Sequence, residues 1–177
     1  MSTATLLPGT FAADPVHSSF GFAVKYQGVS IFRGTLDEVN ATFADGKLEG
    51  VAKVESISIR TPEQFRAHVL SDDFFAADKF PEVKFSSTDV TLNEDGTATI
   101  VGDLTIRDTT QSVTAAGTWT APDADAFGNT RAHLQLATAI DRTSFGLTWN
   151  APLPNGGNAL ANDVTLTVDL ALIQQQG

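Results

Sequence analysis

Side chains capable of acid–base, nucleophilic or metal chemistry are few in this 177-residue sequence. It contains three histidines, His17, His68 and His133, and no cysteine, which excludes disulfides, thiolate metal sites and cysteine nucleophiles. The sequence has neither the His-Glu-x-x-His spacing of zinc hydrolases nor the Gly-x-Ser-x-Gly motif of α/β-hydrolases. We therefore expect no catalytic residues, no metal site and no cofactor.

Arginine and histidine could instead hold a polar group of a ligand. Arg66 and His68 lie in the segment 60–85, and Arg142 precedes a Gly-, Pro- and Asn-rich loop at 143–162. Guanidinium groups match phosphate oxygens bidentately, so these side chains are our candidates for a ligand head group. Aspartates close in sequence allow a second interpretation, in which the arginines form ion pairs that hold loops to the body of the protein.

Period-two alternation of apolar side chains dominates the sequence and predicts strands. Asp45-Gly46, between two such segments, is the residue pair that a type I′ hairpin turn prefers. Eight strands are predicted, at 10–26 with a break at Pro15, 31–44, 47–59, 82–92, 97–107, 110–120, 130–142 and 163–173.

Eight long antiparallel strands joined mostly by tight turns can close on themselves, which removes their exposed edges. A barrel of about this size has room for one small ligand. We expect an all-β fold, an eight-stranded antiparallel lipocalin-like barrel, with a short helical lid inserted between strands three and four. An immunoglobulin-type sandwich is the alternative, but its crossovers need longer connections than this chain has.

The segment 60–85 is the predicted lid. Thr61 is a candidate N-cap, Pro62 would occupy the first helical position, and Pro81 prevents the helix from continuing. Five phenylalanines in so short a span are more than a polar connection needs, so the segment should cover something apolar.

Composition limits the classes of partner. The formal charge of −10 opposes general attraction to nucleic acid, and a chain of this length suits one domain, residues 1–177. Residues 1–11 do not have the basic region and apolar core of a signal peptide, and we therefore expect a cytoplasmic protein.

Seven segments in order resemble the motifs of the YceI-like family. They are HSSF at 17–20, GVSIFRG at 28–34, RAHVLSDDFF at 66–75, FPEVKF at 80–85, GDLTIR at 102–107, DRTSFGLTWN at 141–150 and NDV at 162–164. The resemblance covers nearly the whole chain, and the shared order and spacing make it specific.

This resemblance implies a lipocalin-like barrel that encloses a long apolar ligand, such as a polyisoprenoid, prenyl phosphate or isoprenoid quinone. It also implies binding without catalysis and a possible homodimer, and family members are often periplasmic. Arg66, His68 and Arg142 remain the head-group candidates. Nine aromatic side chains are expected to contact the apolar part of the ligand: Phe20, Phe22, Phe32, Phe65, Phe74, Phe75, Phe85, Phe145 and Trp149.

Core packing explains any single phenylalanine on a strand better than ligand contact does, because every barrel needs apolar residues inside. The alternative function is therefore a stress-related interaction protein, with a barrel filled by its own side chains and an aromatic lid that binds another protein.

Overall fold

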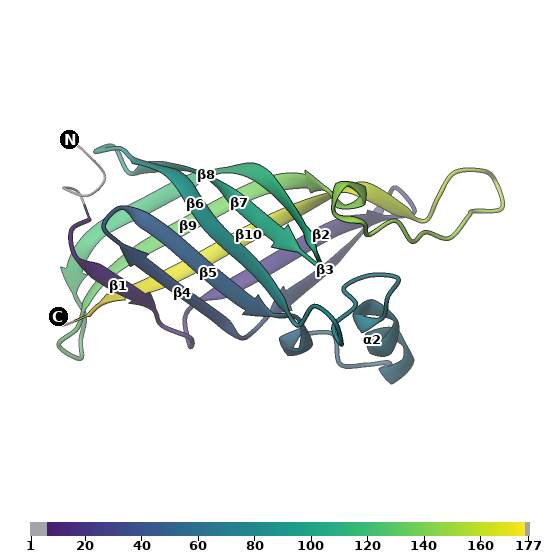
Figure 1. The fold of residues 1–177 in the computed structure, drawn as a ribbon, viewed down its shortest axis with the longest axis horizontal. Helices are drawn as coiled ribbons and strands as arrows, with labels where there is room; N and C mark the ends of the chain where they lie inside the picture. The colour runs from purple at the N-terminus through teal and green to yellow at the C-terminus, as the bar shows by residue number, and fades with distance from the viewer. Residues whose placement is uncertain (1–6, 176–177) are drawn as a thin grey trace.

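Antiparallel strands form a closed barrel in the computed structural model, which describes residues 7–175 (Figure 1). Its strands are β1 (Thr10–Ala13), β2 (Ser19–Tyr26), β3 (Ser30–Leu36), β4 (Val39–Ala44), β5 (Lys47–Lys53), β6 (Glu82–Leu92), β7 (Thr97–Ile106), β8 (Thr109–Ala124), β9 (Thr130–Asp141) and β10 (Leu160–Gln174). Two 3-10 turns, η1 (Val54–Ser56) and η2 (Arg142–Phe145), and one helix, α2 (Glu63–Leu70), complete it.

The barrel is eight strands around, because two of its strands are bent. β1 and β2 both pair with β10, at different levels, and they are the two halves of the predicted strand that breaks at Pro15. β3 pairs with β2 and β4 with β1, so the predicted strand 31–44 is also one bent strand. The predicted eight-stranded antiparallel barrel is confirmed.

Local turn chemistry agrees with the sequence at the β4–β5 hairpin. Asp45 and Gly46 have φ angles of 52° and 78°, the two positive values that a type I′ turn requires. The third predicted strand, 47–59, is too long, because β5 ends at Lys53. There the hydroxyl of Ser56 donates to the Lys53 carbonyl and accepts from the Glu38 amide, which turns the chain into η1.

The helix α2 lies between β5 and β6, the third and fourth strands of the eight, as predicted. Its expected capping was wrong by one position. Pro62 has an extended ψ of 152° and is itself the N-cap, with no side-chain cap bond. Its carbonyl accepts from the amides of Phe65 and Arg66 at 3.0 and 3.1 Å, so helical structure begins at Glu63.

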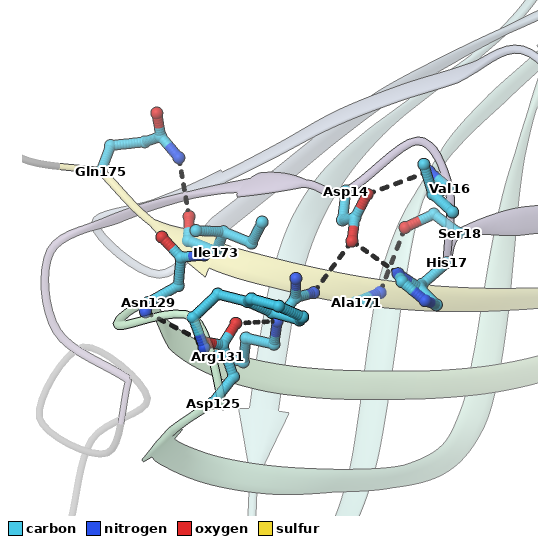
Figure 2. A network of polar contacts seen from close by, with 11 residues as sticks. Asp14, Val16, His17, Ser18, Asp125, Asn129, Arg131, Ala171, Ile173 and Gln175 are labelled. Atoms are coloured by element: carbon cyan, nitrogen blue, oxygen red, sulfur yellow. Dashed lines mark hydrogen bonds and ion pairs between the residues drawn. The ribbon is translucent and has the colours of Figure 1, made fainter.

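Closely packed side chains fill the end of the barrel near the two chain termini. Phe11, Phe43, Ile100 and Leu172 are fully buried there. A polar bracket, defined as Asp14, His17, Arg131 and Asp125, ties the bend between β1 and β2 to the β8–β9 hairpin (Figure 2).

Hydrogen bonds within the bracket lower the pKa of both of its carboxylates, Asp14 and Asp125. Asp14 accepts from His17 Nδ1 at 2.7 Å, from the Val16 amide at 2.9 Å and from Arg131 Nη1 at 2.9 Å. These bonds, led by that of His17, lower the pKa of Asp14 from 3.8 to about 2. The guanidinium of Arg131 likewise holds the pKa of Asp125 well below its usual range.

No helix within residues 7–175 is long and apolar enough to cross a membrane. The expectation drawn from the N-terminal segment rests largely on residues 1–6, which lie outside the described residues.

Candidate ligand-binding site

A cavity of about 690 Å3, here called the chamber, occupies the end of the barrel beside α2. Its lining residues belong to six strands, β2, β3, β6, β7, β9 and β10, together with α2, the segment that follows α2, η2 and the loop that follows η2. The few polar side chains along it are those of Tyr26, Ser30, His68 and Arg142. Its volume falls in the range of roughly 300–1,000 Å3 that is typical of small-molecule sites.

Aromatic rings join the lid segment to the barrel on one side of the chamber. Phe65 of α2 meets Phe32 of β3 edge to face, with ring centroids 5.5 Å apart. Phe75 lies 6.4 Å from Phe22 of β2, and Phe22 lies 6.0 Å from Phe32. Such geometries stabilise aromatic pairs, so the barrel and the segment after β5 share one aromatic wall.

A second aromatic group closes the other side. The ring of Trp149 lies 4.7 Å from that of His68 and 5.4 Å from that of Phe74. His68 Nε2 also lies 2.9 Å from a carboxylate oxygen of Asp73. The lid segment and the loop after η2 therefore meet through side chains that also line the chamber.

Seven of the nine predicted aromatic side chains line the chamber: Phe20, Phe22, Phe32, Phe65, Phe74, Phe75 and Trp149. Phe85 instead lines a smaller cavity, about 90 Å3, farther along the barrel. Phe145 lines neither of these two cavities, because it ends η2 with its ring buried in the core.

Two phenylalanine rings lie against glycines of the neighbouring strand. An added Cβ at Gly34 would fall 2.5 Å from the Phe22 ring, and one at Gly102 would fall 2.4 Å from the Phe85 ring. Because carbon atoms in contact are about 3.5–4.0 Å apart, a larger residue at either glycine would displace the ring. The glycines let these rings lie along the wall.

Two of the three head-group candidates, His68 and Arg142, line the chamber, and Arg142 is the more deeply buried. It is almost fully buried, and its guanidinium donates to three backbone carbonyls: Nε to Ala161 at 2.9 Å, and Nη1 to Leu147 at 2.6 Å and to Trp149 at 2.8 Å. Nη2 is buried and has no partner within the described residues. Burial without a bonded carboxylate lowers the pKa of Arg142.

Arg66 lies elsewhere. Its guanidinium donates to the carbonyls of Glu55, Ile57 and Ile59 at 2.8–3.3 Å, and it does not line the chamber. The loop-holding interpretation fits Arg66, although its partners are carbonyls rather than aspartates. The sequence alone does not show whether an arginine such as Arg66 donates to backbone carbonyls or to a carboxylate.

Comparison with known proteins places this geometry in a family. The model of the YceI-like domain matches residues 11–172, which include every strand of the barrel in whole or in part. The chain belongs to the YceI-like family.

Curated relatives match over most of the length of this chain and of their own. A UPF0312 protein of Pseudomonas fluorescens Pf-5 is 33% identical over 142 residues, which cover 73% of this chain and 71% of the relative. One from Pseudomonas putida F1 is 25% identical over 166 residues, covering 90% and 83%.

Solved structures share the fold at lower identity. BcnA of Burkholderia cenocepacia has a TM-score of 0.70 at 16% identity and covers 92% of this chain and 99% of its own. A polyisoprenoid-binding domain from Saccharophagus degradans, implicated in plant cell wall breakdown, has a TM-score of 0.64 at 9% identity, with coverage of 94% and 99%.

Sequence reasoning missed one residue at the mouth of this YceI-like barrel. Arg107, in the tight turn between β7 and β8, donates from Nη1 to the carbonyls of Asp72, Phe74 and Gly146 at 3.2–3.4 Å. It thereby links the lid segment to the turn after η2. The only signal was its place at the end of the GDLTIR motif, which identifies the family but not this contact.

Proposed function

We propose that this protein binds, without catalysis, a long apolar ligand of the polyisoprenoid class, such as a prenyl phosphate or an isoprenoid quinone, and carries or stores it. The main support for this proposal is the chamber of about 690 Å3, whose lining is almost entirely apolar. Transfer of each methylene from water into such a lining contributes about 0.8 kcal/mol. The fold likeness to a polyisoprenoid-binding domain of Saccharophagus degradans supports the choice of ligand class.

Arg142 is the proposed anchor for the head group. It is the one arginine among the described residues of the chamber lining, and its Nη2 is an unused donor. An unpaired buried donor is unfavourable, so an oxygen of a phosphate or quinone brought beside it would be stabilised. His68, whose ring packs against that of Trp149, is the second proposed polar contact.

The alternative, a barrel filled by its own side chains, describes the end near the termini but not the end beside the lid. The chamber therefore argues against a barrel filled by its own side chains. The aromatic side chains of the lid line that chamber and pack against the barrel, which argues against a lid that binds another protein.

Native mass spectrometry of protein purified without detergent tests the proposal. Bound lipid should appear as extra mass, and the apo protein should take up added prenyl compounds. Ala159→Phe, which places a ring in the chamber, should reduce uptake at least about tenfold. The matched variant Ala139→Phe changes an exposed position on β9 and should leave uptake unchanged. A folded wild-type protein that takes up no prenyl compound would refute the proposal.

Two finer expectations accompany it. Assembly as a homodimer should appear in sedimentation velocity as a species of twice the 18.7 kDa chain mass. A cytoplasmic location should appear on cell fractionation as protein in the cytoplasmic rather than the periplasmic extract.

A further inference from the structure

The chamber and the smaller cavity are neighbours within one barrel, and three side chains line both. These are Phe20 of β2, Val83 of β6 and Leu166 of β10. They are contributed by three separate strands, so together they form a constriction between the two spaces. The space beside the lid is about 690 Å3, whereas the space beyond the constriction is about 90 Å3.

Beyond the smaller cavity, closely packed side chains fill the barrel near the termini. Phe11, Phe43, Ile100 and Leu172 have no exposed surface, and Trp119 donates its indole N–H to the Asn93 carbonyl at 2.8 Å. A chain that enters beside the lid therefore meets a narrowing at Phe20 and then a packed core.

The length of the chamber can be measured along β2. The strand from Tyr26 to Phe20, whose alternate residues line the chamber, has seven residues, and the six steps between them span roughly 20 Å at about 3.3 Å per step. An extended chain advances about 3.6 Å for every three bonds, so roughly sixteen main-chain carbons fit this distance. That corresponds to about four isoprene units.

We infer that Phe20, with Val83 and Leu166, sets an upper limit of about four isoprene units on the chain this protein accepts. The inference rests on the proposed function and narrows it to the shorter isoprenoids. Phe20 has this role because its ring is the largest group at the constriction. The ring is only partly buried, and it contacts both the chamber and the smaller cavity. A longer chain has to leave its remaining units outside the mouth, in water.

A competition experiment tests the limit. Detergent-free protein is mixed with equal amounts of geranylgeraniol, with four isoprene units, and a polyprenol of eight units, and the bound masses are compared by native mass spectrometry. Wild type should hold the shorter prenol in excess by about tenfold or more, since tenfold corresponds to about 1.4 kcal/mol. Phe20→Ala should shift this ratio toward the longer prenol by about tenfold.

Phe22→Ala is the matched control, because Phe22 lies two residues along the same strand and lines only the chamber. It should leave the ratio within about twofold of wild type. Phe20→Leu, a milder change, should shift the ratio in the same direction if Phe20→Ala does not fold, and thermal unfolding identifies the folded variants.

The outcomes separate the two proposals. Equal occupancy by both prenols in wild type, or equal shifts by the Phe20 and Phe22 variants, would overturn the length limit and leave lipid binding intact. Absence of both prenols from folded wild type would overturn lipid binding itself.

Discussion

Replacement of Gly34 by alanine tests the claim that glycine shapes the aromatic wall. An ideal Cβ at Gly34 falls 2.5 Å from Cζ and 2.9 Å from Cε1 of Phe22, whereas ordinary carbon contact begins at about 3.5 Å. The φ of Gly34 lies outside the left-handed region, so alanine meets no backbone strain. The ring of Phe22 must therefore move away from the wall.

The expected magnitude follows from two opposing terms. Forcing a ring out of a well-packed position costs about 1–3 kcal/mol. Replacing glycine in a strand recovers roughly 0.5–1 kcal/mol, because the unfolded chain loses freedom. Gly34→Ala should therefore lower the free energy of unfolding by about 1 kcal/mol, within a range of about 0–2.5 kcal/mol, measured by urea denaturation.

Gly50→Ala is the matched control. A Cβ at Gly50, also on a strand, meets only the Ala41 Cβ and the Asn40 carbonyl at 3.7 Å, which is ordinary contact. This variant should be as stable as wild type or more stable by roughly 0.5–1 kcal/mol.

The Phe22→Ala background isolates the clash, since there is then no ring to displace. In that background the cost of Gly34→Ala should disappear, a coupling of about 1–3 kcal/mol. If Gly34→Ala is as stable as Gly50→Ala, or if its cost persists without the Phe22 ring, the steric argument is wrong.

Three further predictions concern polar groups. Arg142→Leu should lower the free energy of unfolding by more than about 3 kcal/mol in urea denaturation, because three carbonyls lose a charged donor. Unchanged stability would contradict the role of Arg142 in holding the loop after η2 to β10. The pKa of Asp14 is about 2 when folded and 3.8 ordinarily, so its stabilisation is full above pH 4 and is lost as pH falls toward 2. Asp14→Asn should flatten this acid limb of stability against pH, whereas Glu94→Gln at an exposed turn should leave it steep. His68→Ala removes contacts with the lid and the facing loop, so limited proteolysis should cut near residue 70 faster than in wild type; an unchanged rate would show that the aromatic contacts do not hold the lid.

The barrel was predictable because alternation, turn residues and strand length all indicate the same closed sheet. Asp45-Gly46 fixed one hairpin, and Pro15 marked one bend correctly. The second bend, between Leu36 and Val39, has no proline and depends on hydrogen bonds from residues far along the chain, such as that from the Asp37 amide to the Ser56 carbonyl. Periodicity does not reveal such contacts.

The site was predictable in character but not in every member. Aromatic side chains in the lid and on β2 and β3 were identified from composition and motif, and they line the chamber. Phe145 was predicted to be one of them, yet it lies at the end of η2 with its ring buried in the core. Arg66 and Arg142 both have aspartates near them in the sequence. Only the fold shows that Arg142 lines the chamber and that Arg66 does not.

The arginines at the mouth have a consequence for how the barrel responds to its surroundings. Arg66, Arg107 and Arg142 all hold backbone carbonyls, which neither titrate nor carry a net charge to be screened by salt. The bracket at the opposite end depends instead on ionised carboxylates. Acid strong enough to protonate Asp14, whose pKa is about 2, therefore loosens the closed end, whereas these arginine contacts keep their charge state.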